Sequence, residues 1–159
     1  MYKSQLLAYI EYRTPAVYHA TRAALERLDN IQIKFLHDAG VNETDALIHF
    51  NLAPLRMRRD IAMLGMLHRA AIGKGPSQLL QLFKRRPGSF RLEDPYEDLT
   101  CAPLIKRSAF GLVKVYNKLG SGAHNISSVH DFQAYLQGRA KQLVMTGYTD
   151  KWDRLYCPR

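Results

Sequence analysis

The 159-residue chain carries 23 Lys and Arg residues against 14 Asp and Glu residues, a formal net charge of +9. Hydrophobic residues make up 47% of the chain, which excludes wholesale disorder and suits one compact domain or one piece of a larger protein. This charge favours acidic partners, nucleic acid before an anionic membrane surface. Most of the excess lies in residues 51–92, where nine basic side chains meet one acidic side chain. Such a concentrated patch indicates nucleic-acid binding more strongly than a diffuse excess of positive charge does.

The cysteines and the amino-terminal residues predict a cellular location. Cys101 and Cys157 are too few for a disulfide framework, so we expect free thiols in a reducing compartment. No signal-peptide pattern is visible, and the apolar run "IAMLGML" is far too short to span a bilayer. We therefore expect an intracellular protein of the nucleus or cytoplasm, neither secreted nor membrane-bound.

Helical periodicity dominates the first third of the chain. Residues 3–13 are apolar at helical spacing, and Pro15 either kinks this helix or starts a second one. Residues 23–39 follow as the cleanest amphipathic helix, with Gly40 as its C-terminal cap. Asn42 reads as the N-cap of a short helix, "ETDALIHF". The apolar stripe expected on 23–39 comprises Leu25, Leu28, Ile31, Phe35, Leu36 and Ala39.

The middle of the chain contains a helix that is predicted to be buried. It runs from Pro54 to Ile72, ends at Gly73, and is apolar nearly all round in its interior. A short helix opening with Pro76 comes next, before the proline-rich segment 84–103, which we expect to be an exposed loop.

The last third of the chain predicts two more helices. Residues 104–119 form a helix weakened by Gly111, and Ser128 caps a helix over 129–145. Strand signals are poor, so we expect an all-α fold, an irregular bundle of five to seven helices. The expected organisation is a helical region 1–86, an exposed loop 87–103, a helical pair 104–145 and a tail 146–159.

No motif in the sequence predicts a catalytic centre, a metal site or a cofactor. The segment "GKGPS" lacks the spacing of a phosphate-binding loop, and the chain has no Asp-Asp pair for two-metal chemistry. The cysteines, His124 and His130 are too scattered for a zinc site, and neither cysteine lies in a nucleophile motif. An enzyme of an unrecognised kind would need a cleft of converging titratable groups.

Three arginines near the start of the 54–72 helix have the wrong sign for a helix N-terminus, which carries partial positive charge. Arg56 can pair with Asp60 one turn later. Arg58 and Arg59 have no acid at that spacing on their C-terminal side. Their charge must be solvated by water, paired with acids from elsewhere in the fold, or neutralised by phosphate.

Aromatic residues interrupt the basic run "LFKRRPGSFR". Phe83 and Phe90 can stack on bases beside phosphate-binding arginines, or they can pack in the core beneath a solvated loop, and both interpretations stay open. For Tyr9, Tyr12 and Tyr18 the core is favoured, because their spacing puts them near one helical face.

Four segments together carry a resemblance to a known family: "YIEYRTPAVYHA", "LERLDNIQIKFL", "ALIHFNLAPLRMRRDIAMLGMLHR" and "RSAFGLVKVYN". They resemble the region downstream of the palm in RNA-directed DNA polymerases (reverse transcriptases) of non-LTR retrotransposons, over residues 5–145. The resemblance implies thumb-like helices that grip the template–product duplex by its backbone without reading sequence. The nucleic-acid-binding residues expected from the resemblance are Arg56, Arg58, Arg59 and Arg69, and the charge pattern adds Lys74, Lys84, Arg85, Arg86 and Arg91.

The chain also departs from that family. It has no Tyr/Phe-x-Asp-Asp motif, no Cys-Cys-His-Cys knuckle and no endonuclease. We therefore expect a detached carboxy-terminal piece of a truncated or degraded element, which binds RNA, DNA or their hybrid but does not polymerise DNA alone. The alternative is a helical protein-interaction module that packs against a polymerase palm or another protein, with apolar surface exposed in its absence.

Overall fold

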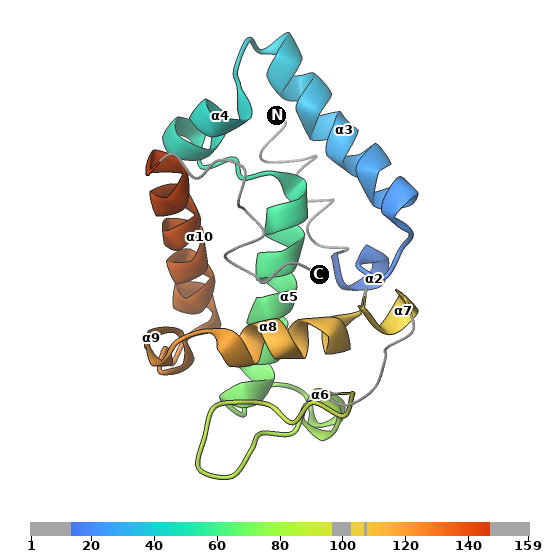
Figure 1. The fold of residues 1–159 in the computed structure, drawn as a ribbon, viewed down its shortest axis with the longest axis vertical. Helices are drawn as coiled ribbons and strands as arrows, with labels where there is room; N and C mark the ends of the chain where they lie inside the picture. The colour runs from blue at the N-terminus through green and yellow to red at the C-terminus, as the bar shows by residue number, and fades with distance from the viewer. Residues whose placement is uncertain (1–13, 97–102, 107, 147–159) are drawn as a thin grey trace.

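The computed structural model describes residues 14–96, 103–106 and 108–146 (Figure 1). The helix expected over 3–13, both cysteines, Tyr9, Tyr12 and residues 147–159 of the tail lie outside these ranges. Within them the all-α expectation is confirmed, since the described residues hold nine α-helices and no sheet. Six of these helices have six or more residues, within the expected five to seven, and the other three are single turns.

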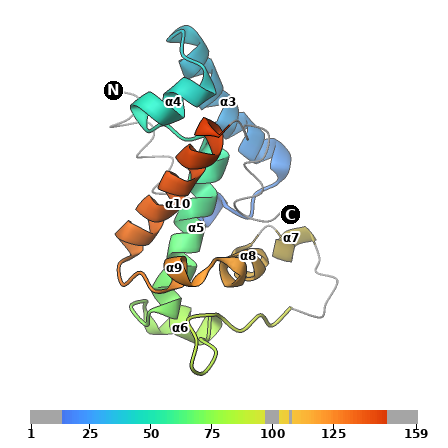
Figure 2. The same ribbon diagram turned by 60° about the vertical axis from the view of Figure 1, so that its left-hand side comes forward.

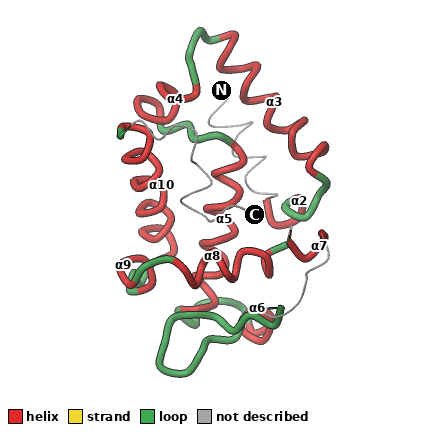
Figure 3. Tube along the Cα trace, viewed as in Figure 1, coloured by secondary structure: helices red, strands yellow, loops and turns green. Residues whose placement is uncertain are grey.

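The elements follow one another in this order: α2 (Thr14–Val17), α3 (Arg22–Asp38), α4 (Glu43–Phe50), α5 (Leu55–Ala71), α6 (Ser77–Leu82), α7 (Pro103–Lys106), the 3₁₀ helix η2 (Ala109–Leu112), α8 (Val113–Lys118), α9 (Ser121–His124) and α10 (Val129–Met145). Figure 3 shows the same path, with the longer loops before and after α4 and around α6.

Helix α5 is the central element of the fold. Eleven of its seventeen residues are buried, as its apolar interior predicts. Helices α3 and α10 pack on α5 from two sides, and η2 and α8 cross its C-terminal half (Figures 1 and 2). Leu64, Leu67, Tyr116, Phe132 and Leu136 are fully buried in the shared core. The regions on either side of the loop therefore contribute to one hydrophobic cluster.

Two side-chain caps fix helix starts as the sequence predicts. The Asn42 side chain accepts a hydrogen bond from the backbone N–H of Asp45 at 2.7 Å, and α4 begins at Glu43, directly after Asn42. The Ser128 hydroxyl accepts from the N–H of Asp131 at 3.4 Å, and α10 covers 129–145. Such caps act within one turn, which is why a local pattern locates them.

The inward face of α3 differs from the predicted stripe. Ile31 is 40% exposed, whereas Gln32 is 3% exposed and its amide donates to the Ala53 carbonyl at 3.0 Å. Asp29, also on the inward side, binds an arginine of α5. Leu36 of the predicted stripe is buried, so the stripe is right in part, and Gln32 and Asp29 share the inward face with it because they have polar partners there.

The single helix expected over 104–119 is broken into α7, η2 and α8. A Cβ at Gly111 would collide with the backbone carbonyl of Lys106, so the chain turns back closely on itself here. Only glycine permits that approach. The 3₁₀ turn of η2 at this point redirects the chain so that α8 crosses α5.

Candidate nucleic-acid interface

A hairpin-like loop over residues 84–94 carries the densest basic run of the chain. The N–H of Arg86 donates to the Arg91 carbonyl at 2.8 Å, and the N–H of Glu93 donates to the Lys84 carbonyl at 2.8 Å. Gly88 turns the chain with a φ of 68°, a conformation that favours glycine. The segment is thus ordered around an antiparallel bridge between Arg85 and Leu92.

The hairpin is fastened to α8 by one amide side chain. Asn117 accepts from the N–H of Leu92 at 2.8 Å and donates to the Leu92 carbonyl at 2.9 Å. The Arg86 Nε donates to the same carbonyl at 3.3 Å. Leu92 is fully buried, although the sequence places it in an exposed loop. The basic residues around it are therefore held on a fixed support.

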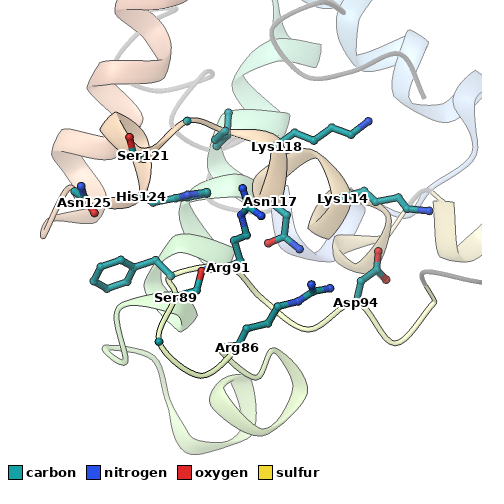
Figure 4. A pocket seen from close by; sticks show the side chains of 14 residues that line it. Arg86, Ser89, Arg91, Asp94, Lys114, Asn117, Lys118, Ser121, His124 and Asn125 are labelled. Carbon is teal, nitrogen blue, oxygen red and sulfur yellow. The ribbon is translucent and has the colours of Figure 1, made fainter.

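A pocket of about 760 Å³ lies between the hairpin, α8 and α9 (Figure 4). Among the described residues that line it, four are basic and one is acidic, namely Arg86, Arg91, Lys114, Lys118 and Asp94. Arg91 is exposed and extends from the hairpin toward α8 and α9. A concave site with this lining attracts anions, because low-dielectric walls focus the field of the cations.

Buried polar residues support the wall of the pocket. The His124 side chain lines the pocket, and its Nε2–H donates to the Tyr116 carbonyl at 2.9 Å. Beneath it, His68 donates from Nε2 to the Ile126 carbonyl at 2.7 Å and accepts the Tyr116 hydroxyl at Nδ1 at 3.0 Å. Burial lowers the pKa of His68 and raises the pKa of Tyr116, so both are neutral near pH 7.

Arg59 does not belong to a nucleic-acid surface. It is 4% exposed, and its guanidinium donates to both oxygens of Asp29 on α3, at 2.7 and 3.0 Å. Its charge is therefore paired with an acid from elsewhere in the fold, which is one of the three alternatives that the sequence leaves open. Arg59 is therefore withdrawn from the expected nucleic-acid-binding residues, because its side chain is buried and its charge is paired inside the fold.

The other arginines of α5 fall into two groups along the helix. Arg56 is exposed near its start, and Arg58 is half-buried and donates to the Asn51 carbonyl at 3.3 Å. Arg69 is exposed near the end, about 20 Å from Arg56 along the axis. Lys74 follows α5 and donates to the Ser127 carbonyl at 2.9 Å. The basic residues of 56–74, which the sequence groups in one patch, are thus divided between the two ends of α5.

The aromatic residues also separate into two groups. Phe83 is 4% exposed and packs near Phe110, with ring centroids 4.9 Å apart. Phe90 is 37% exposed, and the Arg85 guanidinium lies 5.4 Å from its ring centroid. Tyr18 is 4% exposed, which confirms its expected core position, and its hydroxyl donates to Asp60 at 2.6 Å. Among Phe83, Phe90 and Tyr18, which the structure describes, only Phe90 is exposed enough to stack on a base.

The sequence did not single out α8 as part of the basic surface. Lys114 and Lys118 are four residues apart in "VKVYNK" and so lie on one helical face, a spacing that could have revealed them. Their proximity to Arg91 depends on the hairpin docking onto Asn117, 25 residues away in sequence. Local periodicity carries no information about that contact.

Comparison with protein-family models, with curated proteins and with solved structures gives no match to this chain. Within the described ranges, no three His, Cys, Asp or Glu side chains gather closely enough to hold a metal ion. No helix in the same ranges is long and apolar enough to cross a membrane. The geometry of the basic pocket and the surface charge therefore carry the functional argument.

Proposed function

We propose that the chain is a thumb-like, non-catalytic fragment of a retroelement reverse transcriptase that binds template–product nucleic acid through its phosphates. The observation that carries this proposal is the basic end of the molecule, where the hairpin and α8 place basic residues of separate segments around one pocket. The resemblance of four sequence segments to the post-palm region of that family, and the all-α fold, support it.

The hairpin residues Lys84, Arg85 and Arg91 form the outer part of this surface. All three are exposed, and they belong to a segment whose backbone is fixed by hydrogen bonds. Cations on a rigid support lose less conformational freedom when they meet a phosphate chain. No base-reading element is required for this mode, so binding is expected to be indifferent to sequence.

A salt series tests the proposal. The dissociation constant of the full chain for a fluorescent RNA–DNA hybrid is measured by anisotropy at several salt concentrations, and we expect a steep loss of affinity with salt. Arg85→Glu and Arg91→Glu together should weaken binding. The slope of the logarithm of the affinity against the logarithm of the salt concentration should fall by about one for each lost phosphate contact. Arg22→Glu is the control for one such charge reversal, because this α3 arginine is 90% exposed and lies outside the basic end. A flat salt response, or equal losses in the control, would refute the proposal.

A second candidate function, a helical protein-interaction module, is favoured by apolar side chains exposed on α3. Ile31 and Ile33 are 40% and 48% exposed. A partner protein that covered this helix would bury apolar surface, and that contact would persist in high salt. Light scattering at about 1 M salt distinguishes the two functions. Self-association that survives there and disappears in Ile31→Lys/Ile33→Lys would favour the interaction module.

A further inference from the structure

We infer that the pocket between the hairpin, α8 and α9 takes a single unpaired nucleotide, with its phosphate on Arg91 and its base against Phe90. The inference rests on the proposed function and deepens it, because it assigns a strand end or overhang, in addition to the duplex, as a ligand of the basic end.

The size and shape of the pocket favour an unpaired nucleotide over a duplex backbone. A duplex presents phosphates to a surface but keeps its bases stacked and paired inside. A concave volume of about 760 Å³ is within the range of small-molecule sites and leaves room for a base as well as a phosphate. A base reaches such a site only when it is out of the stack.

Two neighbouring residues supply complementary groups at the pocket. Arg91 provides the cation, and its backbone is fixed because its N–H donates to the Ser89 hydroxyl at 3.0 Å. Phe90 lines the same pocket with 37% of its surface exposed. The Arg85 guanidinium lies 5.4 Å from the Phe90 ring centroid, which orients the ring by a cation–π contact. Aromatic rings held in this way stack on any base.

The opposite wall carries polar groups suited to a base edge. Ser121 and Asn125 line the pocket beside His124 (Figure 4). Serine hydroxyls and asparagine amides both donate and accept hydrogen bonds, as unpaired base edges require. A polyglutamate peptide would neutralise the cations and could hydrogen-bond these groups through its backbone, but it has no flat aromatic face to stack on Phe90. The combination therefore favours a nucleotide.

The test compares two probes that differ only in a single-stranded end. The full chain is titrated by fluorescence anisotropy against a blunt RNA–DNA hybrid and against the same hybrid with a four-nucleotide DNA overhang. We expect the overhang to bind about fivefold more tightly or better, the lower end of what one stacked base contributes. Phe90→Ala should abolish this advantage while changing the affinity for the blunt hybrid less than about twofold. Phe50→Ala is the matched control, an exposed phenylalanine on α4, outside the pocket lining, and should keep the advantage.

The outcomes separate this inference from the proposed function. Salt-dependent binding of the blunt hybrid without any overhang advantage overturns the inference and leaves the proposed function standing. Failure to bind either probe overturns both. The inference is also overturned if the overhang still binds more tightly than the blunt hybrid in Phe90→Ala. It is overturned too if an octaglutamate peptide displaces the overhang probe with the same efficiency as an eight-nucleotide DNA strand.

Discussion

The Arg59–Asp29 pair allows a sharp prediction, because its two partners differ in exposure. The Arg59 side chain is 5% exposed and the Asp29 side chain is 24% exposed. Asp29→Ala leaves the buried guanidinium without its acid, and we expect this to cost about 3–5 kcal/mol of unfolding free energy. Arg59→Met leaves a carboxylate that water partly solvates, so its cost should be smaller, about 1–3 kcal/mol.

Urea unfolding followed by circular dichroism at pH 7 measures both costs. The double variant should be close to Arg59→Met alone, since the second change then removes a carboxylate that has lost its guanidinium. Arg22→Met is the control, because the Arg22–Glu26 pair on α3 is 90% and 54% exposed and should contribute less than about 0.5 kcal/mol. Equal costs for Arg59→Met and Asp29→Ala, or costs for both that do not exceed that of the control, would contradict this prediction.

Three further outcomes follow from other contacts. His68 has a lowered pKa in the folded protein, so the unfolded chain binds more protons and stability should fall as the pH drops below 6.5. In His68→Asn the urea midpoint should therefore depend less on pH over that range. Gly111→Ala should cost about 1–3 kcal/mol by collision with the Lys106 carbonyl, whereas Gly138→Ala, with open space around it, should raise the thermal midpoint. Asn42→Ala should cost about 1 kcal/mol by loss of the α4 cap, and an unchanged urea midpoint would contradict this.

Several features could be predicted because their causes are local. The starts of α4 and α10 follow from Asn42 and Ser128, whose side chains bind backbone groups three residues away. The burial of α5 follows from an apolar sequence nearly all round its axis. The fold class follows from the same periodicity and from the lack of strand signals.

The candidate site could be predicted only in part. Arg86 and Arg91 belong to a basic run that the sequence shows, whereas the pocket that they line is not visible in the sequence. Its remaining cations come from Lys114 and Lys118, and its position depends on Asn117 binding Leu92. Those contacts join segments about two dozen residues apart, and neither composition nor periodicity specifies them.

The arginines at the start of α5 show most clearly where sequence and tertiary structure divide. Local periodicity is enough to place them at the N-terminal end of a buried helix, where the partial positive charge of the helix opposes them. The inward turn of Arg59 to Asp29, 30 residues earlier, and the exposure of Arg56 depend on how α3 packs against α5. The physical reason is that a residue on a helix between two neighbours acquires its partner from packing, and packing brings together side chains that are distant along the chain.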